Sequence, residues 1–397
     1  MATPSFGLAE LLDPVSCDAF FRLHWERKPL HLRRSNAAYY SRLLTLSDLE
    51  KLIGRPGMRF PAIQLSRSGS YYPASVFTED RRLGPDTFTG VVNFPRLNAE
   101  YRAGATVVLP GLHMTWQPLA DLCSRLDDQL NHVAHANAYL TPGNTAGFAP
   151  HYDTHEILVL QLSGAKRWRV YAPPIELPHR RQPFDPVGYV LPEEPVLEVE
   201  LTPGDLLYLP RGYVHTTTTS AASSAHVTIG IDVYTWLDLA GEVMRQALTS
   251  PKFRAALPPG FSSRADRHPL AEELSSVLTE LTRVASVDSL VEDFLAGVAG
   301  RSTPPRGDFH AEVTVVQAHT PLVAPDPHSY RLATMEGQAA LEFRGRRYLL
   351  PAAALPALQA MQSRRTFTAS ELPAGLDIES RLALVRTLVE KKFLTIA

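Results

Sequence analysis

Two histidines and one aspartate in this chain are spaced so that together they can hold one metal ion. His151 and Asp153 flank a tyrosine, and His215 ends the run Gly-Asp-Leu-Leu-Tyr-Leu-Pro-Arg-Gly-Tyr-Val-His that begins at Gly204. Two imidazoles and one carboxylate fill one face of an octahedral Fe(II) ion and leave the opposite face open for a co-substrate and dioxygen. These residues therefore predict a non-haem iron site with oxidative chemistry.

Strands are the elements that must position these side chains. Residues two apart in a strand point to the same side, so we expect His151 and Asp153 to face one barrel mouth. The third ligand must come from a distant segment. His215 fits this role because a Pro-Gly-Asp turn, an apolar strand and a Pro-Arg-Gly kink precede it and can redirect the chain.

Other histidines compete for the same role. His155 shares the strand face of the first two ligands if the strand runs straight, so it is an alternative ligand. We assign it instead to packing or to the surroundings of the ligands, because it would leave the Gly204–His215 segment unexplained. His135 and His226 are weaker alternatives, which we interpret as buried or surface histidines.

The region around the candidate ligands is rich in short apolar segments that proline and glycine separate. Such a pattern predicts a double-stranded β-helix, the jelly roll of the cupins. A preceding amphipathic helix is predicted over residues 116–130, with leucines at 119, 122, 126 and 130 on one stripe. The expected strands span residues 136–140, 157–162, 167–171, 206–209 and 227–233.

The remainder of the chain has a different texture. Apolar periodicity predicts helices over 239–248 and 270–298, and Arg301–Gly307 is typical of a linker. A small α/β region follows, which we interpret as a winged-helix-like module with strands at 313–316, 339–343 and 393–396 and helices at 352–362 and 380–391. The α+β chain is therefore expected to have three domains: 1–236, 237–303 and 304–397.

Composition excludes several classes of protein. The 397 residues are 45% hydrophobic and 20% charged, which is typical of globular proteins rather than disordered or membrane proteins. A formal net charge of -2 gives no electrostatic case for direct nucleic-acid binding. Cys17 and Cys123 are too few for a disulfide framework. With no signal peptide or membrane span recognisable, we expect a cytoplasmic location and no membrane partner.

At this point the chain resembles the JmjC-type ribosomal oxygenases, which are cupin-fold protein hydroxylases that depend on Fe(II) and 2-oxoglutarate. The resemblance covers essentially the whole length. It implies a JmjC domain, a helical dimerisation region and a C-terminal winged-helix domain, and hence a homodimer. The motifs that carry it are Trp25–Leu30, Asn137–Pro142, Gly147–Asp153, Leu160–Tyr171 and Gly204–His215.

The resemblance also implies roles for individual residues. His151, Asp153 and His215 match the iron ligands, and Lys166 matches the basic residue that binds the distal carboxylate of 2-oxoglutarate. A chelating dicarboxylate needs such a cation in any case, although a lysine after Gly164 is otherwise expected in a solvated turn. Further polar contacts to the co-substrate are implied for Asn137, Tyr139 and Thr228. Otherwise the tyrosine would be a core aromatic, and the threonine a structural strand residue.

The chain departs from the family pattern beside the candidate ligands. The family commonly has an acidic and then an aliphatic residue after His-x-Asp, where this chain has Thr154 and His155. The run Thr216–Ala225 is shorter than in some relatives. Both departures alter the expected substrate pocket rather than the iron site.

The resemblance implies hydroxylation of a protein side chain, at the β-carbon of a histidine or arginine in a ribosomal protein. Alternatives remain open within the same chemistry: another peptide, a natural product, or demethylation of a methylated lysine. An alternative of a different class is a non-catalytic adaptor, a metal-holding cupin whose last domain binds a partner. The intact ligand set and Lys166 favour an enzyme.

Overall fold

The chain divides into two units, Met1–Val233 and Tyr234–Ala397, and each is described by itself. Within the described part of the chain, no helix has the length and apolar character needed to cross a bilayer. The computed structural model describes residues 6–248, 250–263, 267–284, 291, 294–295, 316–325, 327, 330–335, 337–343, 346–391 and 393–396.

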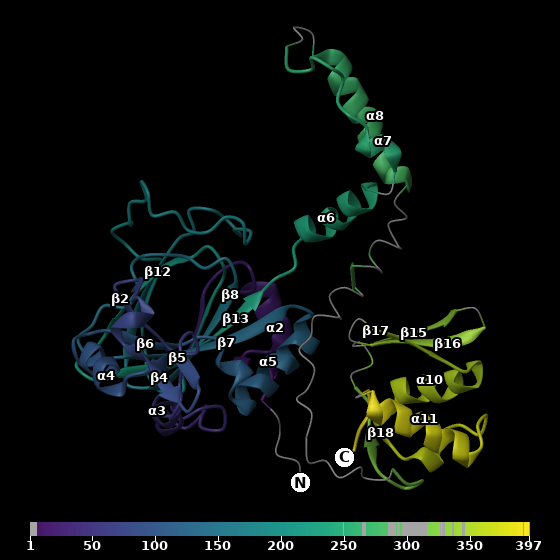
Figure 1. Ribbon diagram of the computed structural model, residues 1–397, viewed down its shortest axis with the longest axis horizontal. Coiled ribbons are helices and arrows are strands. Elements are labelled where there is room, and N and C mark those ends of the chain that lie inside the picture. The colour runs from purple at the N-terminus through teal and green to yellow at the C-terminus, as the bar shows by residue number, and fades with distance from the viewer. Residues whose placement is uncertain are drawn as a thin grey trace. The chain divides into compact units, whose positions relative to one another are not determined.

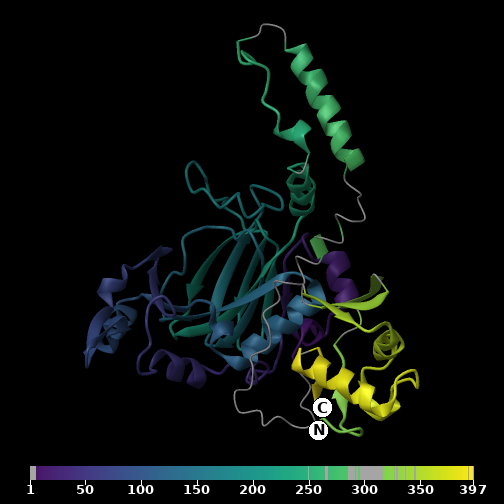
Figure 2. The ribbon, with the colours of Figure 1, turned by 45° about the vertical axis from the view of Figure 1, so that its right-hand side comes forward.

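An eight-stranded sheet dominates the first unit, with the order β1-β11-β8-β13-β7-β6-β2-β3. Figures 1 and 2 show β7, β8 and β13 side by side at its centre. These neighbours pair antiparallel, with β13 between β7 and β8. The strands are β1 (Leu30–Leu32), β2 (Gln64–Arg67), β3 (Ser70–Tyr71), β6 (Thr106–Leu109), β7 (Val133–Thr141), β8 (Glu156–Ser163), β11 (Leu206–Leu209) and β13 (Ser224–Asp232).

A second, three-stranded sheet packs against the first. It has the order β10-β9-β12, with β9 (Lys166–Tyr171) between β10 (Leu197–Leu201) and β12 (Val214–Thr219). Side chains of β8 alternate between two cores because successive strand residues point to opposite faces. Ile157 and Val159 pack with Trp168 of β9 between the sheets, whereas Leu158 and Leu160 face the other way. Two facing antiparallel sheets are the predicted jelly-roll arrangement.

Short helices cover the outer face of the larger sheet. In α5 (Gln117–Leu130), the apolar stripe at 119, 122 and 126 is buried, as the sequence predicted, and contributes to the main core together with Leu158 and Ile229. Thr45 caps α3 (Leu46–Ile53), because its hydroxyl accepts a hydrogen bond from the Asp48 amide at 3.1 Å. The other elements here are α1 (Leu8–Leu12), α2 (Cys17–Leu23), α4 (Phe94–Arg102), β4 (Thr78–Leu83) and β5 (Asp86–Val92).

The second unit begins with helices α6 (Trp236–Ala247), α7 (Pro251–Arg254) and α8 (His268–Val284). The predicted end of the helical region, the predicted linker and most of the predicted strand at 313–316 lie outside the described residues. Two small sheets follow, ordered β18-β14-β19 and β15-β16-β17. Their elements are β14 (Leu322–Val323), β15 (Tyr330–Met335), β16 (Gln338–Phe343), β17 (Arg346–Leu350), α10 (Leu355–Ser363), β18 (Thr366–Phe367), α11 (Ile378–Glu390) and β19 (Thr395–Ile396).

Where the named strands and helices fall within the described residues, the predicted bounds agree with these elements within a few residues at each end, except at residues 151–153. The division between the units follows Val233, near the predicted boundary at 236, and the second predicted boundary at 303 lies outside the described residues. The three-domain division therefore stays a prediction.

Candidate metal centre and pocket

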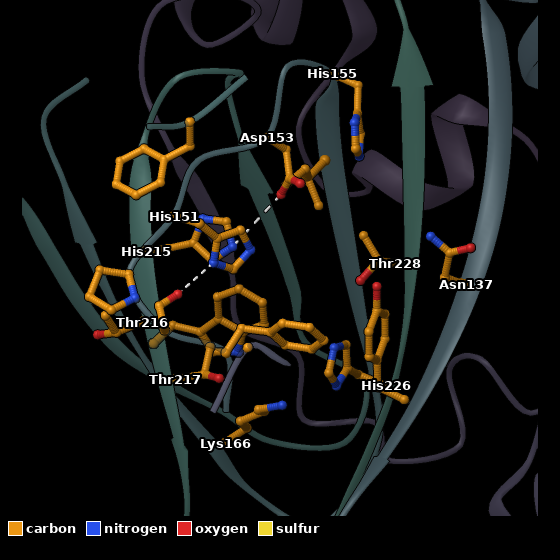
Figure 3. A pocket seen from close by; sticks show the side chains of 18 of the residues that line it. Asn137, His151, Asp153, His155, Lys166, His215, Thr216, Thr217, His226 and Thr228 are labelled. Carbon is orange, nitrogen blue, oxygen red and sulfur yellow. Dashed lines mark hydrogen bonds and ion pairs between the residues drawn. The ribbon is translucent and has the colours of Figure 1, made fainter. Parts of the chain in front are cut away.

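The three predicted metal ligands converge at one end of the jelly roll. Their ligand atoms all lie within 4.8 Å of one another, and Figure 3 shows the three side chains pointing toward a common point. The His151 and His215 ring centroids are 4.4 Å apart, and His215 Nε2 lies 3.8 Å from Asp153 Oδ2. Among the described residues, this is the only cluster of three metal-ligating side chains.

One detail of the prediction is wrong. Residues 152–155 are not in a regular strand: β8 begins at Glu156, and His151 forms only an isolated bridge with His215. The connection between β7 and β8 is held there by main-chain hydrogen bonds. The His215 amide donates to the His151 carbonyl at 2.9 Å, and the Gly212 amide donates to the Asp153 carbonyl at 3.0 Å. Backbone pairing, rather than strand alternation, therefore places the ligands.

Carbonyl oxygens orient both imidazoles. His151 Nδ1 lies 2.7 Å from the Ala149 carbonyl, and His215 Nδ1 lies 3.2 Å from the Tyr213 carbonyl. A carbonyl oxygen can only accept, so each Nδ1 carries the hydrogen and each Nε2 keeps a free lone pair. This is the tautomer that a metal-binding histidine needs.

The protonation states also suit a cation. Burial tends to raise the pKa of Asp153, but the neighbouring imidazoles of His155, His151 and His215 outweigh it, so that this pKa lies below its usual value. Burial, together with His151, lowers the pKa of His215 to about 4. At neutral pH the carboxyl group is ionised and the His215 ring is neutral, which are the ligand forms.

A cavity of about 510 Å³ extends from these ligands into the barrel. Its lining combines the three ligands with aromatic and polar side chains from both sheets. These include Tyr71, Asn137, Tyr139, Phe148, His155, Lys166, Trp168, Phe184, Thr217, His226 and Thr228.

Lys166 is the most unusual group in this cavity. The side chain is only 3% exposed, and its Nζ donates to Thr141 Oγ1 at 3.3 Å. Burial lowers the pKa of Lys166 to about 7. No carboxylate pairs with it among the described residues, so the buried amine lacks the anion that such a group needs. The solvated-turn interpretation is therefore wrong, and the site fits an anionic ligand.

The remaining predicted co-substrate residues line the same cavity. Asn137 and Tyr139 share a face of β7, and the register of β13 places Thr228 opposite Asn137. Asn137 Oδ1 accepts a hydrogen bond from the Gly111 amide at 2.9 Å. Burial raises the pKa of Tyr139, so its phenol is neutral and can donate.

Several cavity residues were not predicted from the sequence, among them His226 and Trp168. His226 was interpreted as an ordinary buried or surface histidine, but it lines the cavity and stacks on Tyr139 with centroids 4.8 Å apart. Its Nδ1 is buried without a hydrogen-bond partner in the described part of the chain. Trp168 lies 5.5 Å from the His215 ring. Along β9, Arg167 and Arg169 alternate in the sequence with Trp168 and Val170, and this period-two pattern could have identified the buried tryptophan.

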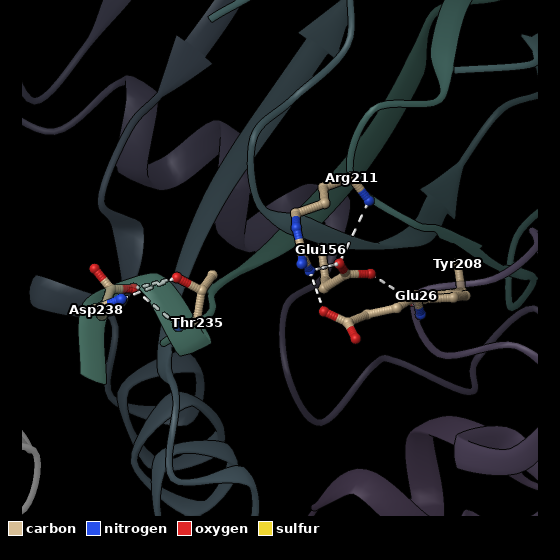
Figure 4. Close-up of polar contacts among 6 residues, drawn as sticks. All are labelled: Glu26, Glu156, Tyr208, Arg211, Thr235 and Asp238. Atoms are coloured by element: carbon tan, nitrogen blue, oxygen red, sulfur yellow. Dashed lines mark hydrogen bonds and ion pairs between the residues drawn. The ribbon is translucent and has the colours of Figure 1, made fainter. Parts of the chain in front are cut away.

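A buried polar network supports the turn before His215 (Figure 4). Arg211 Nη1 lies 2.7 Å from Glu156 Oε1 and 2.5 Å from Glu26 Oε1. The Tyr208 hydroxyl donates to Glu156 and accepts a hydrogen bond from the Glu26 amide at 2.9 Å. Tyr213 in turn donates to the Arg27 carbonyl at 2.7 Å. The N-terminal segment is thereby tied to the turn that leads into β12 and its candidate ligand His215.

Comparison with known proteins identifies the central region. Residues 114–239 match the family model of the JmjC domain. The chain contains a JmjC domain. The candidate ligands, Lys166 and the other predicted co-substrate residues all lie within the matched range.

Curated relatives bear out the resemblance of the chain to ribosomal oxygenases. Ribosomal oxygenase 1 of Homo sapiens is 32% identical over 324 residues, which are 74% of this chain and 47% of that protein. The "Bifunctional lysine-specific demethylase and histidyl-hydroxylase NO66" of Drosophila persimilis is 32% identical over 223 residues, 56% of this chain and 31% of that protein. The chain thus spans less than half the length of either relative.

Solved structures confirm the fold of the JmjC domain. The Escherichia coli ribosomal oxygenase YcfD matches with a TM-score of 0.53 and 17% identity, covering 96% of this chain and 98% of that one. Another structure of YcfD, in complex with cobalt and 2-oxoglutarate, matches equally, with a TM-score of 0.53, 17% identity and the same coverage. The predicted cupin-type fold with mixed helices and sheets is therefore correct.

Proposed function

We propose that this chain is an Fe(II)- and 2-oxoglutarate-dependent oxygenase that hydroxylates a protein side chain. The observation that carries the proposal is one cavity with two matched features. A set of two histidines and one aspartate lines it at one end, and the buried amine of Lys166 lines it without a carboxylate partner among the described residues. A metal-chelating dicarboxylate satisfies both.

His151, Asp153 and His215 would hold the iron, and Lys166 would pair with the distal carboxylate of 2-oxoglutarate. Bound iron and 2-oxoglutarate supply the oxidising chemistry with dioxygen, and yield succinate and carbon dioxide. The chain's own groups orient the metal ligands and exclude water. Carbonyl oxygens hold the imidazoles in the binding tautomer, while Trp168 and Phe148 line the cavity and keep bulk water from it.

The proposed substrate is a histidine or arginine of a ribosomal protein. The names of the relatives support this class, since they refer to ribosomal oxygenases and to histidyl hydroxylation. The same names include a lysine-specific demethylase, so removal of a methyl group from lysine is the competing reaction. Both reactions use the same metal and co-substrate.

Turnover of 2-oxoglutarate tests the enzymatic class. Protein loaded with iron under anaerobic conditions is exposed to oxygen, and succinate is measured. We expect wild-type turnover and a loss of at least about a hundredfold in His151→Ala, because removal of a ligand empties the site. No succinate from the wild type, or equal succinate from the variant, would establish the non-catalytic adaptor instead.

Mass spectrometry tests the substrate. Ribosomal proteins from cells with and without this gene are compared, and hydroxylation adds about 16 Da to one residue. A gain of methyl groups in the deletion strain, without a hydroxylated residue in the parent, would indicate the demethylase instead.

We further propose that the helices after the JmjC domain form a homodimer interface. Trp236 and Leu237 of α6 are 86% and 60% exposed, and Leu274 of α8 is 57% exposed. Apolar side chains with such exposure favour a surface that binds a partner, and a second copy of this chain is the simplest partner. Light scattering at micromolar concentration checks this: we expect a dimer mass for the wild type and a monomer mass for Trp236→Asp. The control Leu83→Asp, at a leucine that is 70% exposed, should keep the dimer mass.

The C-terminal region is proposed to be a winged-helix-like module. The helices α10 and α11 followed by the terminal strand β19, which pairs with β14, support this description. We also propose a cytoplasmic location, which the shortage of cysteine supports.

A further inference from the structure

Two imidazoles beside the metal ligands have no part in the proposed iron site. His155 lines the cavity next to Asp153, and its ring contacts that of His135, which belongs to β7. In Figure 3, His155 lies on the Asp153 side of the cavity and Lys166 lies at the opposite side. Neither ring nitrogen of His155 is hydrogen-bonded to any residue that the structure describes.

The backbone makes room for this pair of rings. Gly230 of β13 pairs with His135 of β7 and with Ile157 of β8. A Cβ atom at Gly230 would lie 2.3 Å from His135 Nε2 and 2.7 Å from His155 Cδ2. Only glycine therefore permits both imidazoles to pack over this strand, with ring centroids 5.0 Å apart at an interplanar angle of 64°.

A carboxylate orients the rear imidazole. Asp232 Oδ2 lies 3.3 Å from His135 Nδ1, so the hydrogen of His135 is held on that nitrogen. Its Nε2 faces Gly230 and the edge of the His155 ring. Asp232, His135 and His155 thus form an ordered row that ends in the cavity. Histidine at position 155 partly buries two ring nitrogens that lack partners among the described residues. An aliphatic residue would pack there without this cost.

We propose that His155, held in place by His135, is a specificity-determining residue that hydrogen-bonds a polar, N–H-bearing side chain of the protein substrate. This inference rests on the proposed function and deepens it. The position is one of the two at which the sequence departs from the family pattern. The contact would therefore distinguish this enzyme from relatives with an aliphatic residue there.

Steady-state kinetics test the role. The probe is the ribosomal protein fraction from cells that lack this gene, and the product is the protein that gains about 16 Da. We expect His155→Leu to raise the half-saturating concentration of the fraction about tenfold, with a smaller change in the maximal rate, since one substrate hydrogen bond is lost. His155→Gln retains a donor and an acceptor and should recover most of the loss. His135→Leu, which removes only the positioning contact, should shift the same constant less.

His268→Leu is the matched control, because His268 is 77% exposed on α8 and the chemical change is identical. Wild-type half-saturation in His155→Leu would overturn the proposal, and so would loss of Co(II) binding in that variant, which would place His155 at the metal. Failure of the proposed function looks different. In that case the wild type itself gives neither succinate nor product, and this inference falls with it.

Discussion

At the scale of single residues, Lys166 decides what the cavity can bind. A cation that is 3% exposed, with a hydroxyl at 3.3 Å, is poorly satisfied until an anion arrives. The buried ammonium of Lys166 therefore destabilises the unliganded protein, and binding of an anion removes this cost. This state has a measurable signature in the unliganded protein.

The signature is a pH dependence of stability. Burial lowers the pKa of Lys166 to about 7 in the folded state, against about 10.4 in the unfolded chain. Between these values the unfolded state binds more protons, so stability rises with pH, and below pH 7 the full cost of burying the charge applies. We expect Lys166→Met to be the more stable protein at pH 6, by on the order of 4 kcal/mol, and this advantage to shrink by pH 9.

Urea unfolding without added ligand checks the difference between the two proteins at each pH. An advantage of the methionine variant that stays constant from pH 6 to pH 9 would contradict the titration of Lys166.

Thermal shifts with 2-oxoglutarate form a second prediction at this scale. A ligand that binds only the folded state at a hundred times its dissociation constant stabilises it by about 2.7 kcal/mol. With Mn(II) present throughout, we expect 2-oxoglutarate to raise the Tm of the wild type clearly and that of Lys166→Met almost not at all, because the metal ligands are intact in both proteins. The control is Lys252→Met, at an exposed lysine, and this variant should respond like the wild type. Equal shifts in all three proteins would remove Lys166 from the binding site.

The residues that could be predicted from sequence are those with a strong local pattern. His151, Asp153 and His215 converge as expected because their spacing reflects ligand chemistry. His226 could not be identified in the same way. Its place in the cavity depends on the β13 register with β7, which sets it opposite Tyr139, and no local pattern encodes that pairing.

At the scale of elements, the turn between β11 and β12 depends on Arg211. The guanidinium is 5% exposed and is paired with Glu156, which is 0% exposed. Removing one partner of a buried pair leaves the other charge uncompensated, so Arg211→Met should destabilise the protein by about 3–5 kcal/mol. Arg169 and Glu198 form an exposed pair, and Arg169→Met should cost only about 0–1 kcal/mol.

Urea unfolding at neutral pH measures both changes. Adding Glu156→Gln to Arg211→Met should restore part of the lost stability, since the remaining charge is removed. A double variant as unstable as the sum of the two single variants would show that the two groups act independently.

Elements with clear periodicity could be predicted from the sequence, whereas β10 and β12 were not predicted as strands. The sequence Leu-Glu-Val-Glu-Leu of β10 alternates as a strand should, but it lies in a proline-rich stretch that was not assigned. The start of β12 was considered only as the place of a ligand, and its threonines as a polar run. The His-x-Asp segment looked like a strand because two-residue spacing does not distinguish a strand from an extended connection held by bridges.

At the scale of the whole molecule, the chain has separate cores. Leu158 belongs to the main core of the first unit, and Leu358 is fully buried in a distinct cluster of the second. We expect calorimetry to resolve two transitions, with Leu158→Ala lowering one and Leu358→Ala the other, each by about 2–5 kcal/mol at that unit. A single transition that both variants lower equally would show that the units unfold together.

The main-chain bridge between His151 and His215 joins the two ligand-bearing segments through peptide groups, independently of which ion the side chains hold. Substituting a redox-silent metal should therefore leave the shape of the chamber unchanged. Protein loaded with Mn(II) or Zn(II), which can be handled in air, would then replace the oxygen-sensitive iron form for capturing the substrate and for screening inhibitors.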